Sequence, residues 1–163
     1  MEREMIIEKE YNKFELLIFE GEYLEGIRWN GKGKEYNRNG ELEFEGEYFN
    51  GFKKKGREYF NKKLIYEGEY LNGHRNGKGK EYNYDGNGNL LFEGEYLNGQ
   101  RNGKGKEYNN NGILIFEGEY LSGQRNGKGK EYDKGHLLFE GEYLNGKRHG
   151  KGKEFNYWGF LIF

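Results

Sequence analysis

Paired glutamates give this chain its first candidate for chemistry. Glu93 and Glu95 are two residues apart, which places their carboxyl groups about 7 Å apart on one face of an extended strand, within the range that glycosidases use for acid and base. The same pair recurs in six places with the same neighbours. An active site needs one distinctive set of groups, so we expect these glutamates to be solvated partners of nearby lysines.

Other residue types that carry chemistry are few and scattered. His74, His136 and His149 fall at different places in the repeated phrase, and the chain has one serine (Ser122), two aspartates and no cysteine. No nucleophile triad or zinc site is predicted from these residues. The recurring NGKGK resembles a phosphate-binding loop, but the Walker spacing is not met and no helix follows. We therefore expect a non-enzymatic protein without a cofactor or a metal.

The charge is almost balanced along the chain, with 27 lysines and arginines against 28 acidic residues. Such a balance argues against recruitment to a membrane, which normally relies on a surplus of lysine and arginine, and we expect no nucleic-acid partner. Residues 51–63, GFKKKGREYFNKK, are the exception, with six basic residues and one acidic residue. We expect a solvated loop in a degenerate repeat here, and the alternative is an anion-binding site for a lipid headgroup, nucleic acid or an acidic peptide. Its candidate residues are Lys53, Lys54, Lys55 and Arg57.

The elements that position these residues come from a repeat. The phrase FEGEYLNGQRNGKGKEY at residue 92 returns almost unchanged from residues 116 and 139. We expect one repeat domain over residues 1–163, with a leading half repeat at 9–18 and a cap or partial repeat at 156–163. Six units begin at the aromatic residue before EGEY, namely Phe19, Phe44, Tyr66, Phe92, Phe116 and Phe139, and Phe163 follows at a similar interval.

Each unit contains two extended runs, such as LIFEGEYL and KGKEYN, joined through NGQRNG and followed by a second short polar segment. Asn-Gly pairs tolerate positive φ and favour hairpin turns. No stretch has helical periodicity. We therefore predict an all-β fold, an elongated single-layer twisted antiparallel meander of stacked β-hairpins. It would have about fourteen strands and a length of about 60 Å at the usual strand spacing.

The core of such a sheet must come from aromatic residues, because alanine and valine are absent and aromatics make up 18% of the chain. We expect rings to stack along one face, each over a glycine of the neighbouring strand. We also expect Glu-x-Glu to face Lys-x-Lys across strands, which accounts for the balanced charge.

These residues point to a family. The phrase FEGEYLNGxRNGKGKEY resembles the MORN repeat, with an aromatic residue, E-G-E, a second aromatic, N-G and then G-x-G. The likeness covers residues 9–163. The resemblance implies hairpins stacked into a twisted single sheet, which serve mostly as protein-interaction platforms. An older proposal assigns such repeats to membrane lipids.

One feature departs from the common MORN pattern. Strict alternation puts Tyr132 on the face of Lys128 and Lys130, as in the shorter bacterial variant of the repeat. We predict a bulge near Lys130 and Glu131 that turns Tyr132 toward the aromatic face.

The functional prediction is a groove lined by tyrosines that binds a protein or peptide, because tyrosine combines ring area with a hydroxyl group. Alternatives are phospholipid binding by the basic segment, glycan binding and a purely architectural role. The candidate partner-binding residues are the tyrosines of EGEY: Tyr23, Tyr48, Tyr70, Tyr96, Tyr120 and Tyr143.

The C-terminal FNYWGFLIF is the most apolar segment. Trp158, Phe160 and Ile162 would share one face of an edge strand, which either caps the ribbon or pairs with a second copy in a homodimer. The N-terminal MEREMIIEKEY has no signal-peptide pattern. We therefore expect a cytoplasmic location, with attachment to a membrane surface as the alternative.

Overall fold

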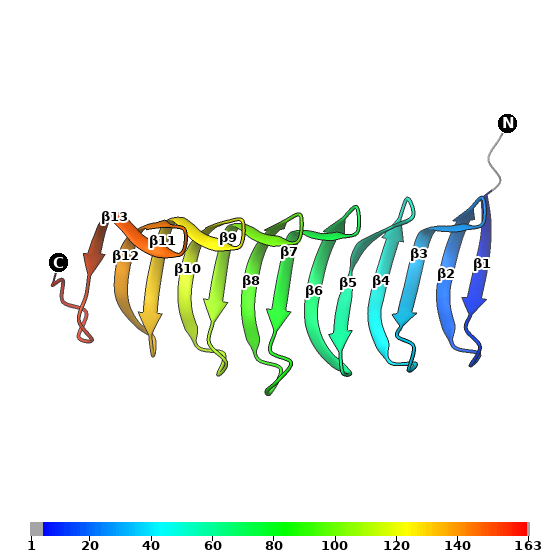
Figure 1. Cartoon of the computed structure of the whole chain (residues 1–163), viewed down its shortest axis with the longest axis horizontal. Helices are drawn as coiled ribbons and strands as arrows, with labels where there is room; N and C mark the ends of the chain where they lie inside the picture. The colour runs from blue at the N-terminus through cyan, green and yellow to red at the C-terminus, as the bar shows by residue number, and fades with distance from the viewer. Residues whose placement is uncertain (1–4, 163) are drawn as a thin grey trace.

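The two extended runs of every repeat form the strands of one sheet. The computed structural model describes residues 5–162, and Phe163 and residues 1–4 lie outside this range. Thirteen antiparallel strands follow one another in chain order, each paired with the strands before and after it in sequence (Figure 1). The strands are β1 (Met5–Tyr11), β2 (Leu17–Leu24), β3 (Ile27–Tyr36), β4 (Leu42–Phe49), β5 (Phe52–Phe60), β6 (Lys63–Leu71), β7 (His74–Tyr82), β8 (Leu90–Leu97), β9 (Gln100–Tyr108), β10 (Leu114–Leu121), β11 (Gln124–Asp133), β12 (His136–Leu144) and β13 (Lys147–Glu154).

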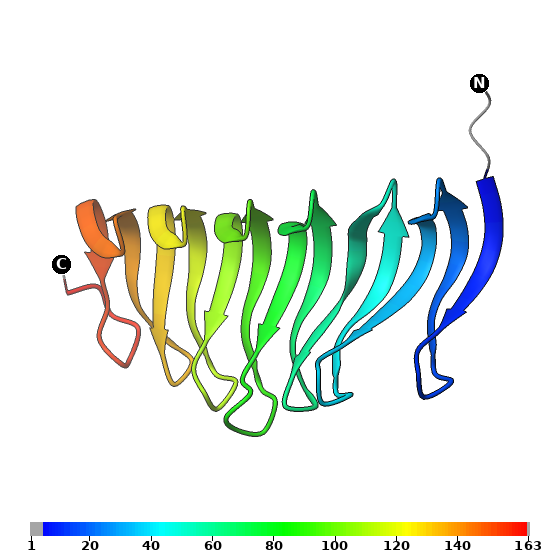
Figure 2. The ribbon, with the colours of Figure 1, turned by 45° about the vertical axis from the view of Figure 1, so that its right-hand side comes forward.

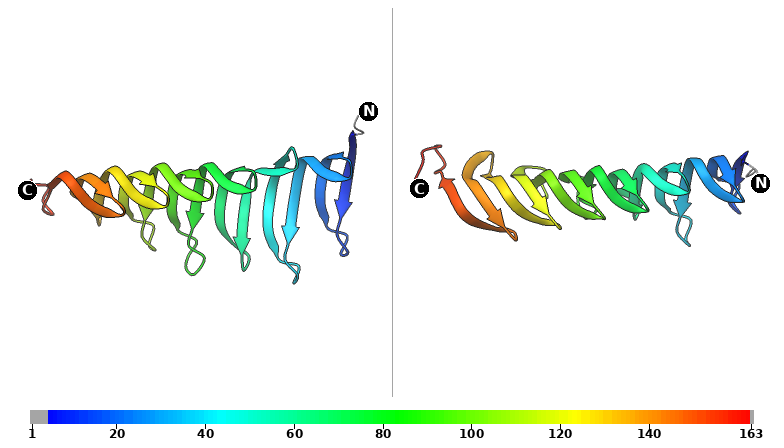
Figure 3. Two further views of the ribbon diagram at one scale, coloured as in Figure 1. Left: turned by 45° about the horizontal axis from the view of Figure 1, so that its top comes forward. Right: turned by 90° about the horizontal axis from the view of Figure 1, so that it is seen from above.

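The predicted single-layer meander is confirmed, with thirteen strands in the described residues where about fourteen were expected. The C-terminal segment accounts for the difference, because it makes only an isolated bridge between Phe155 and Leu161. The hairpins are bent across the width of the sheet (Figure 2), and the sheet winds along its length (Figure 3). A twist of this kind is the usual outcome of paired strands of L-residues.

The hairpin turns are shorter than predicted. Only two residues join the strands of a hairpin, for example Asn98 and Gly99, which have φ of 50° and 84°. Two positive φ values characterise the type I′ turn, whose twist matches that of paired strands. The second Asn-Gly pair of the phrase lies inside the second strand, where Gly103 also has a positive φ of 84°. It forms a bulge that shifts the register between β8 and β9.

Backbone hydrogen bonds also tie the tips of most successive hairpins together. The Gly99 amide donates to the Arg75 carbonyl at 2.8 Å, and the Gly123 amide donates to the Arg101 carbonyl at 2.9 Å. The Asn76 side chain accepts a further, longer bond from the Asn98 amide at 3.4 Å. The repeated NGxRNG therefore connects the tips of successive repeats into a continuous edge.

The core is a single file of aromatic rings along one face of the sheet. Phe92 contacts Tyr96 of its own repeat at 5.6 Å and Tyr120 of the next repeat at 5.1 Å between ring centroids, both edge to face. Such pairs contribute roughly 0.5–1.5 kcal/mol each beyond area burial. The same alternation links all twelve rings of the core: Phe19, Tyr23, Phe44, Tyr48, Tyr66, Tyr70, Phe92, Tyr96, Phe116, Tyr120, Phe139 and Tyr143.

Facing glycines make room for the first ring of each repeat, as predicted. Gly94 and Gly105 are direct partners on neighbouring strands. A Cβ on Gly105 would lie 2.4 Å from Cζ of Phe92, and one on Gly94 would lie 2.7 Å from the Gly105 Cα. No real side chain tolerates such distances, so both positions require glycine.

Candidate interaction surface

The six EGEY tyrosines form part of the core and do not line an open groove. Their exposed fractions range from 3% at Tyr96 to 9% at Tyr48. The prediction that these tyrosines line an open groove is therefore wrong. The alternation of residues in the sequence placed these rings on one face of the sheet. It did not indicate that this face is covered. The covering comes from the bent hairpin and from a cation above the first ring of each repeat.

A cation lies above the first core ring of each of the six repeats, an arginine in five of them and a lysine in one. The Arg101 guanidinium lies 4.2 Å from the Phe92 ring centroid, and Arg75 lies 4.0 Å from that of Tyr66. Lys53 takes the same place over Phe44, at 4.0 Å. Cations over aromatic faces are attracted by the ring quadrupole. The arginine after the hairpin turn is thus a structural residue, a role that its place in a loop-like phrase did not indicate.

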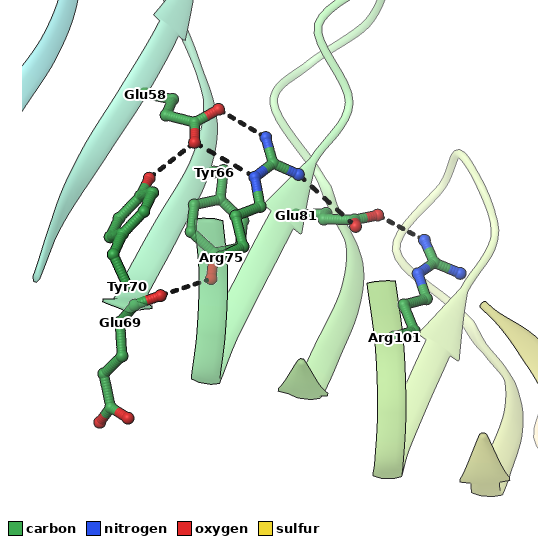
Figure 4. Close-up of polar contacts among 7 residues, drawn as sticks. All are labelled: Glu58, Tyr66, Glu69, Tyr70, Arg75, Glu81 and Arg101. Atoms are coloured by element: carbon green, nitrogen blue, oxygen red, sulfur yellow. Dashed lines mark hydrogen bonds and ion pairs between the residues drawn. The ribbon is translucent and has the colours of Figure 1, made fainter. Parts of the chain in front are cut away.

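Each cation is held by the glutamate of the preceding K-E-Y or its equivalent. Glu58 accepts hydrogen bonds from the Tyr70 hydroxyl at 2.7 Å and from Arg75 at 2.6 Å (Figure 4). Arg75 also lies 3.8 Å from Glu81, which accepts from Arg101 at 2.5 Å. Partly buried ion pairs therefore connect successive repeats above the ring stack.

This arrangement shifts the pKa values of its members. Burial alone would raise the pKa of Glu58, but the hydrogen bonds from Arg75 and Tyr70 hold it below the usual value. Burial, with the hydrogen bond to Glu10, raises the pKa of Tyr23 to about 12. The buried Tyr96 hydroxyl has no hydrogen-bond partner among the described residues. Burial nevertheless raises the pKa of Tyr96, with a further contribution from the nearby Glu81.

The opposite face of the sheet contains a long trough. It has a volume of about 1740 Å³, and residues from β2 to β13 line it. Its floor is glycine backbone, and its polar groups are the glutamates of EGE and the basic residues of KGK or its equivalent. We call it the charged trough.

Register fixes the order of charges in the charged trough. Glu93 is paired with Lys80 on one side and with Lys106 on the other, and Glu117 is paired with Lys106 and Lys130. The predicted opposition of Glu-x-Glu and Lys-x-Lys is confirmed. The charged trough therefore carries bands of alternating sign, one strand wide, along its whole length.

Hydrogen bonds orient the trough glutamates. The second glutamate of each EGE lies nearer the hairpin tip; Glu95, in this position, accepts from the Lys104 amide at 3.2 Å and so stabilises the bulge. The first glutamate lies farther from the tip; Glu93, in this position, accepts from the Tyr108 hydroxyl at 2.8 Å. Lys104 and Lys106 are exposed. The lysines thus extend into solvent while the carboxylates are held near the sheet.

The bulge predicted near Lys130 and Glu131 lies one residue later, between Glu131 and Tyr132. It does not turn Tyr132 toward the aromatic face. The Tyr132 hydroxyl donates to Glu117 at 2.7 Å, on the face of the charged trough. At this register shift Leu138 of β12 has no paired residue on β11. The side chains of β11 therefore continue to alternate between the two faces.

The basic segment does not form one surface. Lys53 lies over the core and donates to Glu35 at 2.8 Å, whereas Arg57 lies in the charged trough, 3.4 Å from Glu67. Lys55 is paired in register with Glu69, also in the trough. Lys54 lies 5.4 Å from the ring centroid of Phe49. The candidate four-residue anion site is thus divided, because neighbours along a strand point to opposite faces.

Trp158, Phe160 and Ile162 are all exposed, at 82%, 68% and 61%. They do not form the expected regular edge strand. The Asn156 side chain accepts from the amides of Trp158 and Phe160 at 3.0 Å, and the Ile162 amide donates to the Glu154 carbonyl at 2.8 Å. The segment is therefore a turn that leads back onto β13.

The described residues contain no group of three or more acidic, histidine or cysteine side chains suited to a metal. His74, His136 and His149 are exposed on separate strands. Within the same residues, no helix could span a membrane.

The sequence profile of the MORN repeat matches residues 66–88, 92–113, 116–136 and 139–156. These segments make up more than half of the chain. The chain belongs to the MORN repeat family. A comparison with curated proteins gives no match.

MORN repeats form a non-enzymatic family whose members generally interact with proteins or membranes. The repeats from Phe19 and Phe44 lie outside the matched segments but have the same geometry. Phe44 stacks on Tyr48 and Tyr70, and Lys53 occupies the place of the arginine. The MORN architecture thus extends over the described chain.

Proposed function

We propose that this MORN-repeat protein is a non-enzymatic scaffold that binds an elongated protein partner along the charged trough. One observation carries the proposal: the trough runs without interruption from β2 to β13 and repeats the same charged bands in each hairpin. An elongated partner would contact several equivalent sites at once, and such contacts multiply weak affinities. On the aromatic face, the rings are buried in the core and do not line a groove of this kind.

Charge reversal within the trough tests the proposal. A variant with Lys80→Glu, Lys106→Glu and Lys130→Glu replaces one of the two trough lysines in each of three successive positive bands. Its matched control, with Lys13→Glu, Lys62→Glu and Lys134→Glu, changes three exposed cations in the turns at the other end of the hairpins. We expect a partner captured from the native cell by the wild-type chain to be retained by the control and lost by the trough variant. Equal retention by both variants would refute the proposal.

A second candidate function, membrane-surface binding, rests on one hairpin tip. Phe49 and Phe52 are each 53% exposed at the turn between β4 and β5, with Lys54 beside them. Aromatic rings next to a cation suit the interface of an anionic bilayer. Flotation with vesicles that contain an anionic phospholipid tests it. We expect binding that is lost in Phe49→Ser/Phe52→Ser, and absence of binding by the wild-type chain removes this candidate.

Glycan binding has less support. Such a role would require tyrosine rings at the surface, and the six EGEY tyrosines are buried. A purely architectural role predicts that trough substitutions change no interaction, so the charge-reversal experiment separates it from the scaffold proposal.

A further inference from the structure

The spacing of the charged bands restricts the conformation of the partner. Two strands, one negative and one positive, make one period of the charged trough, as in the series Lys80, Glu93, Lys106 and Glu117. At about 4.8 Å per strand the period is about 9.6 Å, with opposite charges half a period apart. A partner must present charges at both intervals.

An α-helix meets both intervals. Seven residues advance about 10.5 Å, and a step of three or four residues advances about 4.5–6 Å on the same face. A row away from the axis of a twisted ribbon follows a winding path, which lengthens the 9.6 Å period toward that of a heptad.

Other regular conformations fit less well. In an extended strand, side chains on one face are about 6.8 Å apart, which matches neither interval. A polyproline II helix advances about 9.3 Å in three residues and matches the full period, but it presents no side chain on the same face at the half period.

A row of exposed leucines borders the charged trough on the same sheet face. Leu121 follows Glu117 and Glu119 at steps of two residues, so all three point to one face. Leu71, Leu97, Leu121 and Leu144 are 55%, 51%, 55% and 45% exposed, one in each successive repeat. The hairpin tips that carry these leucines are joined by the backbone hydrogen bonds between repeats. A repeated exposed apolar row of this kind indicates a contact surface.

We propose that the partner is an amphipathic α-helix with a heptad repeat, which lies along the charged trough. One apolar residue in each heptad packs against the leucine row. Lysine and glutamate alternate at steps of three or four residues on the adjoining face, with lysine over the EGE strands and glutamate over the KGK strands. This inference rests on the proposed scaffold function and specifies the class of its partner.

Three synthetic peptides of about 28 residues, four heptads of roughly 10.5 Å each, test the inference. The first has leucine once per heptad and alternating lysine and glutamate. The second keeps the leucines and the composition but gathers lysine in one half and glutamate in the other. The third is a proline-rich peptide with lysine at every third residue. Binding to the full chain is measured by fluorescence anisotropy, and helix formation by circular dichroism.

We expect the alternating peptide to bind as a helix, and the block peptide to bind at least about tenfold more weakly, because charges out of register are repulsive. The trough variant with Lys80→Glu, Lys106→Glu and Lys130→Glu should lose this binding. A peptide with lysine in place of each glutamate should restore it. In parallel, Leu97→Ser/Leu121→Ser should weaken binding while the thermal unfolding of the chain stays unchanged.

Equal binding of the alternating and block peptides, tighter binding of the proline-rich peptide, or failure of the alternating peptide to bind would each overturn the inference. The scaffold function would survive these results if capture of the native partner still depended on the trough lysines. The scaffold function and the helical partner can therefore be refuted independently of each other.

Discussion

At the scale of single residues, the fold depends on the space above glycine. The ring of Phe92 lies where a side chain on Gly94 or Gly105 would be, and its other face is covered by Arg101. A sheet one layer thick obtains buried rings in this way, with no second layer of aliphatic side chains. Phe92 is 0% exposed despite this thin architecture.

The variant Gly105→Ala should therefore destabilise the protein by about 1–3 kcal/mol, the usual cost of overpacking. Its Cβ would meet Cζ of Phe92 at 2.4 Å. In Phe92→Leu this atom is missing, so the double variant should lose less stability than the sum of the two single variants. Urea unfolding of the four proteins measures the coupling, and additive losses would contradict the seating of the ring on glycine.

At the scale of the repeat, one cation contacts both the first aromatic ring of its own repeat and the glutamate of the preceding repeat. The side chain of Arg101 is 24% exposed, and that of its partner Glu81 is 23% exposed. The Lys53 repeat shows that lysine can fill this place. The positive charge is therefore the requirement, and the planar guanidinium adds a second donor.

Arg101→Ala should lower the free energy of unfolding by about 2–3 kcal/mol, because it removes the nearer of the two cations that pair with the partly buried Glu81 carboxylate. Arg101→Lys should cost much less. Arg57→Ala, in which the lost side chain is 56% exposed, is the matched control and should have little effect. Similar losses for Arg101→Ala and Arg57→Ala in urea unfolding would show that the bridge above the ring is unimportant.

The sequence was sufficient for the strands and the ring stack, because aromatic residues and glycines recur at fixed steps of two. It was not sufficient for the function of each face. Alternation places Tyr120 and Glu119 on opposite faces of the sheet. Which of the two faces is covered depends on the bulge at Gly127 and on Arg125 above Phe116. The four basic residues were grouped from their closeness in sequence, and strand alternation separates them.

At the scale of the molecule, the repeats stack in a line, and each strand pairs only with its immediate neighbours. Stability in such a protein is a sum of repeat and interface contributions. Tyrosines with raised pKa values occur along the length of this line, so ionisation affects all repeats together. Burial is the largest cause, and it raises the pKa of Tyr82, Tyr108 and Tyr143 to about 12.

A pKa raised from 10 to about 12 means that the folded state keeps the proton after the unfolded state has lost it. The stability of the folded state is therefore complete below pH 10 and falls as the pH rises from 10 toward 12. We expect phenolate absorbance to appear together with the loss of the β-sheet signal in circular dichroism. Ionisation of these tyrosines near pH 10 with the sheet intact would contradict their burial.

We propose that the aromatic face holds the molecule together and that the charged trough binds the partner. Lysine acylation with mass spectrometry, with and without the captured partner, tests it most directly. We predict that the partner protects Lys80, Lys106 and Lys130 from the reagent, while Lys13, Lys62 and Lys134 in the turns react at unchanged rates. Protection of the turn lysines, with the trough lysines fully reactive, would place the partner outside the charged trough and refute the proposed binding face.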